Sequence, residues 1–348
     1  MKTCRILLSI TIGMAFFFGC NDHDETVSPP APLPGTPFEI QAWDYSTNHF
    51  FVDTTYLPYY ELYYQSNPPI IHAETQVTDE EVWVESDRDP THLVNSLRCV
   101  AYINLGPRGQ GYDPGLRTAG QVPGQVESGR FYRLNRSEYS MTADGYIGVV
   151  SFKVPLRDDA AIGIAYRRAN QIQFGEFLPE VVDTSSIVII LKMLKPRNLQ
   201  SNGPAYPLAW RQLLKNIYPI GSHNVREVGF TLDILFAPSG SSPTNRILGQ
   251  PLLRALRLDR YNPDGTPAPA GDGQFDFRPD VTIDPQEGEI ILPFVRPFDE
   301  GLRRYFLNQG LVLPDTSIYL APEVYDTTRT FAQASQRRYT ISGRAQNY

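Results

Sequence analysis

Cysteine is scarce in this chain of 348 residues, which holds three, at positions 4, 20 and 99. Cys4 lies inside an apolar N-terminal run that has the form of an export signal, and Cys20 closes that run. A mature chain would keep Cys99 as its one free thiol, so a disulfide framework is excluded although the signal indicates export. Cys99 lies in the apolar segment RCVAYINL, where we expect a small buried side chain.

Motifs of common enzyme chemistry are also missing. The five histidines are scattered, and the sequence has no HExxH zinc pair and no GxSxG nucleophile turn. Adjacent carboxylates occur at Glu80 and Glu81 and at Asp158 and Asp159, but such pairs are usually solvated charges. The segment GPRGQGYDPG lacks the GK[ST] of a phosphate loop and is predicted to be a surface loop. We therefore predict that the protein is not an enzyme, with no catalytic and no cofactor-binding residues.

A block of basic residues is absent as well. Loss of the N-terminal run would remove Lys2 and Arg5 from the 31 basic residues, leaving 29 against 38 acidic residues and a formal charge of −9. Nucleic-acid binding depends on clustered Lys and Arg that neutralise phosphates. The mildly acidic mature chain argues against a nucleic-acid partner.

The one long apolar run lies at the N-terminus, from Ile6 to Phe18, after a basic start. It is shorter than the ~20 apolar residues of a lasting transmembrane helix. Gly19 and Cys20 resemble the end of a bacterial lipobox, so we predict a lipoprotein signal over residues 1–20 and a lipidated Cys20 that anchors the body to a membrane. An ordinary secretory signal is the alternative interpretation.

A tether is predicted over residues 21–37. Its first part, Asn21–Glu25, is acidic and is similar to surface-export tags of lipoproteins, although a solvated tether explains it equally well. Its second part, TVSPPAPLPGTP, is rich in proline and should be extended and semi-rigid. The folded body is expected to begin near Phe38.

Strand patterns dominate the body, and alternation in YIGVVSFKV and FTLDILF is typical of half-buried strands. Strands are predicted at Val82–Glu85, Leu97–Leu105, Tyr146–Val154, Ala160–Arg167, Ile187–Met193, Val228–Phe236, Gly288–Pro293 and Arg338–Gly343. Helices are predicted at Pro207–Ile217, Asn245–Leu256 and Phe298–Asn308. In the first helix, Trp210 belongs to an apolar face at helical spacing and is expected to pack in the core, with ligand binding as the minor alternative.

The fold class that follows is mainly β. The stretch Pro196–Pro204 interrupts both periodicities, which predicts a β-sandwich-like module over residues 38–195 and a second β-rich module with a few short helices over residues 196–348. No transmembrane barrel is expected, because barrel strands need ~9 to 11 residues in regular succession. The tyrosines of PYYELYYQ could mimic an aromatic girdle but are expected to pack under a loop instead: Tyr59, Tyr60, Tyr63 and Tyr64.

The stretch from Leu252 to Phe298 joins an apolar helical pattern, a loop rich in aspartate, and the strand-like EIILPFV. The loop approximates a DxNxDG calcium loop with one inserted residue and without the terminal Glu. Its candidate calcium ligands are Asp259, Asn262, Asp264, Asp272 and Asp276. The alternative is that these side chains cap turns and accept backbone N–H bonds. A melting temperature that does not respond to millimolar calcium or chelator would exclude the calcium site.

Eleven segments in constant order resemble the N-terminal region of the SprA/Sov family, giant outer-membrane proteins of Bacteroidota associated with type IX secretion and gliding motility. They are EVWVES, RCVAYINLG, RLNRSEY, GYIGVVSF with AAIGIAYRR, QFGEF, IILKMLKP, AWRQLLKNIYPIG, VGFTLDILF, the stretch Leu252–Phe298 and VYDTTRTFAQASQRRYTISGR. The resemblance spans roughly Val77 to Arg344 and does not include the family's pore.

This resemblance implies a non-catalytic lipoprotein that docks to outer-membrane secretion or motility proteins. We expect it at the cell outer membrane, on the cell surface or the periplasmic face, held by the lipid at Cys20. Because the sequence stops near a strand, a truncated or split translocon piece is a variant of this interpretation. The alternative is a surface lipoprotein that binds glycans on exposed aromatic side chains.

Overall fold

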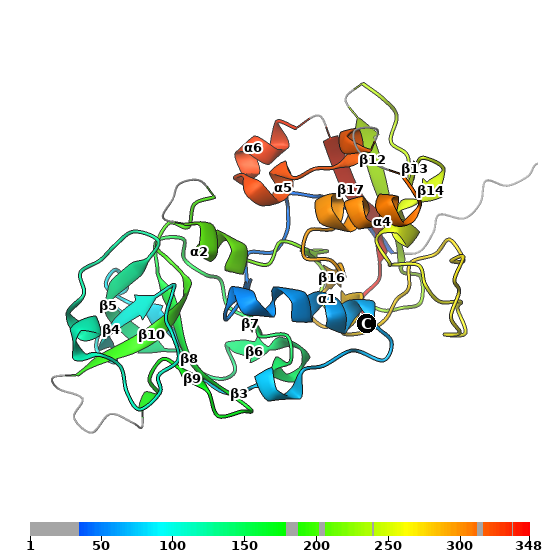
Figure 1. The fold of residues 1–348 in the computed structure, drawn as a ribbon. Helices are drawn as coiled ribbons and strands as arrows, with labels where there is room; N and C mark the ends of the chain where they lie inside the picture. Colours follow the sequence, from blue (N-terminus) through cyan, green and yellow to red (C-terminus); the bar gives the residue numbers. More distant parts are fainter. Residues whose placement is uncertain (1–34, 179–186, 202–205, 239, 312–315, 336) are drawn as a thin grey trace, which may run out of the picture. The chain divides into compact units, whose positions relative to one another are not determined.

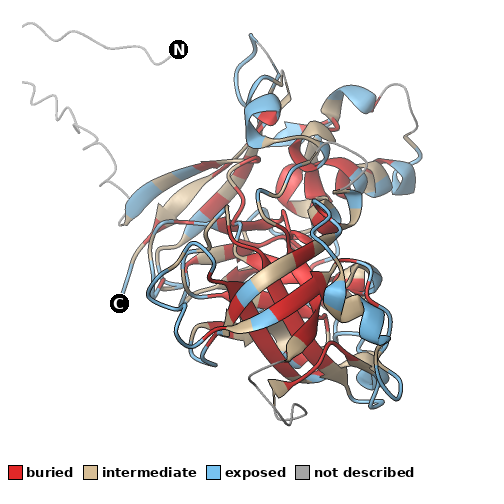
Figure 2. Cartoon of the chain, turned by 90° about the vertical axis from the view of Figure 1, so that its left-hand side faces the viewer, coloured by how far each residue is buried: buried red, intermediate tan, exposed pale blue. Residues whose placement is uncertain are grey.

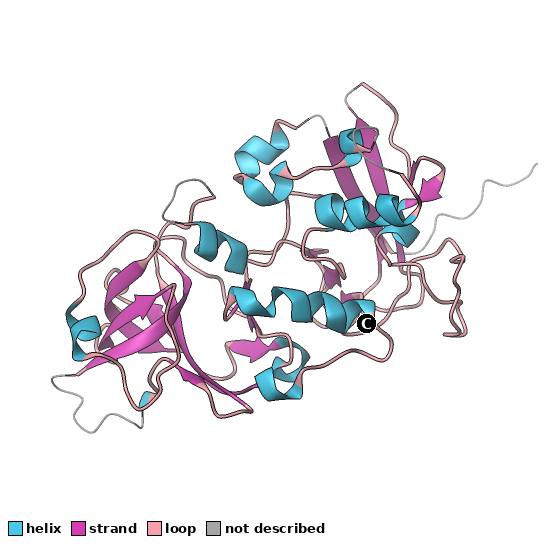
Figure 3. Cartoon of the chain, viewed as in Figure 1, coloured by secondary structure: helices cyan, strands magenta, loops and turns pink. Residues whose placement is uncertain are grey.

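A computed structural model describes residues 35–178, 187–201, 206–238, 240–311, 316–335 and 337–348. Short helices alternate with many strands over this part of the chain (Figures 1 and 3), which confirms the mainly β class with a few short helices. All eight predicted strands overlap an observed strand. Within the described residues, no helix is long and apolar enough to cross a membrane. The predicted signal, the tether up to Pro34 and the lipidation site Cys20 lie outside the described residues.

Five strands form a closed ring, which we call the ring below. Its members are β3 (Val77–Glu85), β4 (Leu97–Tyr102), β5 (Val126–Arg133), β8 (Ile162–Arg168) and β10 (Val188–Lys195). The order around the ring is β10-β4-β5-β3-β8, and the pairing of β8 with β10 closes it. All pairs are antiparallel except β4 with β10. Strand β9 (Gln173–Phe174) extends the sheet beyond β8.

The predicted sandwich for this region is wrong, because one sheet closes on itself where two facing sheets were expected. Every ring strand sends side chains into one buried cluster, in which Trp83, Phe131 and Leu191 meet small residues such as Ala101 and Ala165. The opposite side chains of β3 and β8 join a second core cluster, so both faces of these strands are buried (Figure 2). Alternation along a strand predicts two faces but not how a sheet closes.

Small residues allow the ring to close tightly. A Cβ atom added to Gly163 would lie 2.9 Å from Leu191 Cβ and 3.5 Å from Ala101 Cβ, so the ring has no room for a side chain there. Cys99 belongs to the same interior cluster and is 1% exposed, as predicted. Burial raises the pKa of its thiol.

A three-stranded sheet pairs the two ends of the described body. Strand β17 (Arg337–Ala345) lies between β1 (Thr36–Gln41) and β12 (Thr231–Pro238), antiparallel to both. The start of the body near Phe38 is confirmed by β1. The predicted strand near the C-terminus is therefore central in its sheet, which explains why Tyr339 and Ile341 are fully buried.

Three smaller sheets complete the β structure. One has the order β2-β7-β6, with β2 (His49–Phe51), β6 (Tyr139–Met141) and β7 (Val149–Phe152). Another has the order β11-β16-β15, with β11 (Ile217–Pro219), β15 (Ile283–Asp284) and β16 (Glu289–Ile291). The third is the hairpin of β13 (Arg246–Ile247) and β14 (Gln250–Pro251).

The helices are short, and two of them differ from the prediction. Helix α2 (Pro207–Gln212) ends five residues early, because the chain then becomes extended and Leu214 N donates to His49 O. Helix α3 (Leu252–Ala255) is one turn long, because the hairpin β13–β14 occupies the first half of the predicted helix. The third prediction is confirmed by the π-helical turn η6 (Pro297–Gly301) and α4 (Leu302–Asn308).

Other short helical segments were not predicted. The α-helical ones are α1 (Leu57–Gln65), α5 (Glu323–Asp326) and α6 (Arg329–Gln333). The 3-10 turns are Thr54–Tyr56, Ala73–Thr75, Pro114–Thr118, Thr142–Gly145 and Ser317–Tyr319. The four tyrosines of PYYELYYQ lie on α1, where Tyr60 and Tyr64 are buried on one face because they are four residues apart. Tyr63 and Tyr64 also line a small pocket with Tyr261 and Asp276 of the segment after α3, in keeping with the predicted packing under a loop.

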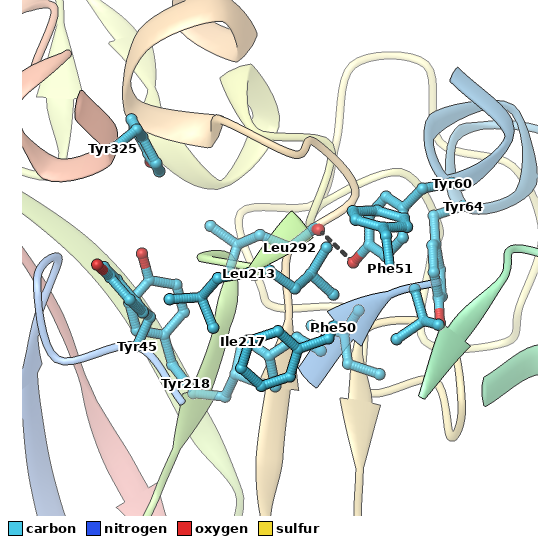
Figure 4. Packing of buried hydrophobic residues seen from close by; sticks show 14 of the residues in the cluster. Tyr45, Phe50, Phe51, Tyr60, Tyr64, Leu213, Ile217, Tyr218, Leu292 and Tyr325 are labelled. Carbon is cyan, nitrogen blue, oxygen red and sulfur yellow. Dashed lines mark hydrogen bonds between the residues drawn. The ribbon is translucent and has the colours of Figure 1, made fainter. Parts of the chain in front are cut away.

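The main hydrophobic core takes residues from both sides of the predicted boundary at Pro196–Pro204. In Figure 4, Phe50 and Phe51 pack near Leu213, Ile217 and Leu292, and Tyr60 Oη donates to Leu292 O at 3.1 Å. Residues Pro34–Tyr348 form one compact unit in their contacts. The division into two modules at this boundary stays a prediction.

Candidate functional site

The stretch between α3 and β15, residues 256–282, which we call the aspartate loop, contains the predicted calcium ligands. Asp259 is buried, and its carboxylate accepts bonds from Asp272 N at 2.8 Å and Gly273 N at 3.1 Å. A Cβ atom on Gly271 would lie 2.3 Å from that carboxylate, so glycine lets the far side of the loop approach. Asp259 therefore connects the two sides of the loop.

Asp276 makes the reciprocal connection. Its carboxylate accepts from Arg260 N at 2.6 Å and from Tyr261 N at 3.3 Å. Burial raises the pKa of Asp276 although both N–H bonds act to lower it. The two aspartates each cap backbone on the opposite side of the loop.

The other three predicted ligands stabilise local turns. Asp264 accepts from Thr266 N at 2.9 Å, and Asp272 accepts from Gln274 N at 2.8 Å. Asn262 Nδ2 donates to Thr266 Oγ1 at 3.0 Å. Over the described ranges, no group of three or more His, Cys, Asp or Glu side chains is arranged to hold a metal ion. The structure supports the turn-capping alternative, and the calcium site stays a prediction with its melting test.

The adjacent carboxylates and the tryptophan that the sequence pointed to have ion-pair or hydrogen-bond partners, which account for their positions. Glu81 pairs with Arg133 at 2.6 Å, Glu80 pairs with Arg136, and Asp159 accepts from Arg157 Nε at 3.1 Å. Trp210 Nε1 donates to Tyr325 O at 2.6 Å, and its ring packs against the main core cluster, as predicted.

The candidate site that emerges from the geometry is a cavity of about 820 Å³ with three chemically complementary side chains in its wall. His49 and Ser151 are direct partners across β2 and β7, so their side chains share one face of that sheet. His49 Nδ1 lies 2.8 Å from Ser151 Oγ. His49 Nε2 lies 3.1 Å from Glu289 Oε1 on β16.

The partners of His49 determine its tautomer. An ionised carboxylate only accepts hydrogen bonds, so the proton of the neutral ring lies on Nε2 and is donated to Glu289. Nδ1 is then an acceptor and receives the hydroxyl proton of Ser151. Ser151 Oγ is also 2.7 Å from Thr142 Oγ1, whose hydroxyl donates to it in this arrangement. The result is a series of hydrogen bonds in one direction, from Thr142 through Ser151 and His49 to Glu289.

Most of this hydrogen-bonded series is buried. His49 is 5% exposed, and the side chains of His49 and Glu289 are 6% and 15% exposed. Ser151 is half-buried and lines the cavity, so its hydroxyl lies at the boundary of buried and accessible space. The order is nucleophile, base and carboxylate, as in a Ser-His-acid triad, but the two ring nitrogens are exchanged, since Nδ1 faces the serine and Nε2 faces the carboxylate.

A strained turn lies beside Ser151. Thr142, Ala143 and Asp144 line the same cavity, and the last two have φ of 51° and 49°. Left-handed backbone at a non-glycine residue costs about 1–3 kcal/mol and is concentrated at functional sites. Gly145 follows with φ of 80°, and a Cβ there would lie 2.3 Å from Val77 O. The turn is held in this conformation by packing against the start of β3.

Acidic groups prevail around the cavity. Its ionisable lining residues besides the triad are Asp44, Asp144, Asp280, Asp284, Glu287, Lys153, Arg329 and His223, together with Tyr45, Tyr63 and Tyr64. Five carboxylates against two permanent cations make the cavity more favourable for neutral or cationic ligands than for anions.

No local motif in the sequence indicates this site. His49 and Ser151 are 102 residues apart, and Glu289 is 240 residues from His49. The three residues lie on different strands. The absence of a GxSxG motif excludes a nucleophile on that kind of turn, but it does not exclude a triad that strand pairing assembles. No family model matches the chain. No curated protein is similar enough to match it either.

Proposed function

We propose that this protein is a lipid-anchored docking protein of the bacterial outer membrane that acts in type IX secretion or gliding motility. The observation that carries the proposal is the resemblance, in constant order from Val77 to Arg344, to the N-terminal region of the SprA/Sov family. Docking itself requires no catalytic step.

The places of the resembling segments support the proposal. EVWVES and RCVAYINLG supply β3 and β4 of the ring, and VGFTLDILF supplies most of β12. The last segment supplies β17, which pairs with β12 from Thr231 to Pro238. These segments are core strands, so the resemblance concerns residues that determine the fold and not variable surface loops.

The mechanism would be an increase in local concentration. Acyl chains on Cys20 would hold the body at one membrane, on the cell surface or the periplasmic face, beside a secretion or motility partner. Docking then becomes an encounter between neighbours on one surface, which raises the effective concentration of the body. A split translocon piece fits the same mechanism, with the pore supplied by another chain.

A crosslinked pull-down from membranes tests this proposal. Wild-type protein should recover an outer-membrane barrel or another secretion component, and Cys20→Ala should lose that recovery because the anchor is lost. Cys99→Ala is the matched control, since Cys99 is buried inside the ring and that variant keeps the anchor. Recovery of no such component by the wild type would contradict the docking function.

A further inference from the structure

We infer that Ser151, His49 and Glu289 form an acyl-transfer site, with Ser151 Oγ as the nucleophile and a neutral or cationic ester or thioester as the substrate. The inference goes beyond the proposed docking function and does not depend on it. It rests on the juxtaposition of three side chains from β2, β7 and β16 in the wall of one cavity.

The hydrogen bonds have the direction that a nucleophile needs. Ser151 Oγ donates to His49 Nδ1 over 2.8 Å, within the range for proton transfer to a general base. Glu289 places both carboxylate oxygens 3.1 Å from His49 Nε2, so it orients the ring and stabilises the imidazolium after proton transfer. Both roles are filled by atoms already in contact.

The reaction balances with these groups and water alone. Ser151 Oγ bonds to the acyl carbon while its proton passes to His49 Nδ1. The bond from the acyl carbon to the leaving oxygen or sulfur then breaks, and the leaving group takes the proton from His49. In the second half, water bonds to the acyl carbon and gives a proton to His49 Nδ1. The bond from the acyl carbon to Ser151 Oγ then breaks, Oγ takes that proton back, and the carboxylic acid leaves.

Thr142 is a positioning residue for the nucleophile. Its hydroxyl is 2.7 Å from Ser151 Oγ and donates to it, which leaves the serine proton directed at His49. The left-handed turn that starts at Thr142 fixes this hydroxyl. Thr142→Val should lower the acylation rate by about tenfold, since the shape of the side chain is kept and one hydrogen bond is lost.

The lining of the cavity indicates the substrate class. Asp44, Asp144, Asp280, Asp284 and Glu287 face the same space as Ser151. A carboxylate on the substrate would be repelled by this set, whereas a quaternary ammonium would be attracted. Tyr45 and Tyr63 also line the cavity and supply aromatic surface for a cationic head group.

A purely structural role for the three residues makes a different prediction. Cross-strand pairing alone would satisfy the buried imidazole, and the serine would then have ordinary hydroxyl reactivity. Labelling by a fluorophosphonate probe separates the two cases, because only an activated serine reacts with it readily. The first experiment is therefore labelling of the full chain, followed by mass spectrometry of the modified peptide.

We expect one adduct on Ser151 in the wild type, none at that residue in Ser151→Ala, and an about 100-fold slower reaction in His49→Gln. Ser342→Ala is the matched control, because Ser342 is a half-buried serine on β17 that is not among the residues lining the cavity. It should label like the wild type. Absence of an adduct at Ser151 in the wild type overturns the proposal, and so does equal labelling after His49→Gln.

Ser151→Cys keeps the proposal testable if the alanine variant fails to fold. A thiol at this place should be ionised by His49 and react with iodoacetamide at least about tenfold faster at pH 7 than a thiol introduced by Ser140→Cys. Equal rates for the two thiols would overturn activation by His49.

A pair of thioesters tests the substrate class. Acetylthiocholine and the acetyl thioester of 3-mercaptopropionate both release a thiol, but one carries a cation and the other a carboxylate. Hydrolysis that depends on Ser151 should be at least about tenfold faster for the cation. Equal rates would overturn the assigned substrate class. Because Cys20→Ala should label normally and Ser151→Ala should still dock, failure of this proposal and failure of docking are distinguishable.

Discussion

The ring and the aspartate loop satisfy unpaired backbone groups with side chains of opposite charge. At the end of β10, Lys195 is buried and its ammonium donates to Arg157 O, Asp158 O and Ala160 O at 2.8–3.0 Å. In the aspartate loop, the buried carboxylate of Asp259 accepts from two N–H groups instead. The carbonyls that Lys195 binds belong to the turn before β8, so in both regions a buried charge satisfies the backbone of an irregular segment, carbonyls in one and N–H groups in the other.

The comparison extends to other buried lysines. Lys192 donates to Ile103 O at 2.7 Å, and Lys215 donates to Leu213 O at 3.0 Å. Lys153 is the one exposed member of the four lysines in the described residues. Three of the four described lysines are therefore interior and donate to backbone carbonyls, and Lys192 also pairs with Asp53 at 2.7 Å, whereas arginines make most of the surface ion pairs.

The largest predicted effect is in the ring interior. Trp83 is 1% exposed inside the ring, and Trp83→Ala should lower the free energy of unfolding by about 3–5 kcal/mol through lost burial and a cavity. Urea unfolding followed by circular dichroism measures the change. A loss below about 1 kcal/mol would show that the ring interior tolerates a void.

The conservative change at the same residue sharpens this prediction. Within the described part of the chain, Trp83 Nε1 is buried without a hydrogen-bond partner. Trp83→Phe removes that polar group and keeps an aromatic ring, so it should cost less than half as much as Trp83→Ala. An equal cost for both variants would mean that the indole N–H is bonded in solution.

The next effect belongs to the aspartate loop. Asp259→Ala leaves the N–H groups of Asp272 and Gly273 without their acceptor and should cost about 2–3 kcal/mol. Asp264→Ala is the matched control, because its carboxylate bonds only local Thr266 groups in an exposed turn and should cost less. Thermal unfolding measures both variants. Equal losses of unfolding free energy in the two variants would contradict a stabilising role for the hydrogen bonds that Asp259 makes across the loop.

How much of this could be predicted depends on how clear the apolar pattern of each strand is. β4 and β17 were found because their patterns are clear over six to nine residues, and the short β16 was found because it lies in an apolar run. The ring strand β5 was missed although it has eight residues, because Glu127, Gly129 and Arg130 interrupt its alternation, and β2 and β15 were missed because two or three residues carry no periodicity. The closure of the ring was also missed, since pairing of β8 with β10 is a property of the folded sheet.

The candidate sites show the same limit. The aspartate loop was found because its residues are neighbours in sequence, and its turn-capping role followed from the ordinary behaviour of Asp and Asn. His49, Ser151 and Glu289 were missed because strand pairing brings them together from distant positions. Glu289 directly follows Gly288, whose place against Ser222 O admits no Cβ, and that constraint is visible only in the structure.

A smaller effect is expected in the pH dependence of stability. Burial lowers the pKa of Lys215 to about 7, from an ordinary value of 10.5, and Arg296 acts in the same direction. Between those values the unfolded chain binds more protons, so the contribution of Lys215 makes stability rise with pH. From pH 7 to 9 this rise should be about 2 kcal/mol, and it should be missing in Lys215→Met.

The comparison of the two proteins across pH is the measurement, because other titrating groups cancel in the difference. Urea unfolding at pH 7, 8 and 9 should give two curves that separate at low pH and converge at high pH. The interval ends at pH 9, since raised pKa values of buried tyrosines such as Tyr60 and Tyr64 lower stability above it. Parallel curves would contradict the buried, weakly basic lysine.

The smallest effects are expected at exposed ion pairs, of which one lies on the ring and one lies outside both regions. Asp79 on β3 pairs with Arg136 at 3.3 Å with 46% of its side chain exposed, and Glu300 beside α4 pairs with Arg304 at 3.4 Å with 50% exposed. Solvent screening leaves such pairs about 0–1 kcal/mol, so Asp79→Asn and Glu300→Gln should each cost less than about 1 kcal/mol in urea unfolding. Salt at 1 M should reduce both costs further. If either variant costs as much as Asp259→Ala, exposed charge contributes as much to stability as the interior capping of backbone groups. If both costs are small, the interior capping in the ring and in the aspartate loop contributes more than exposed charge does.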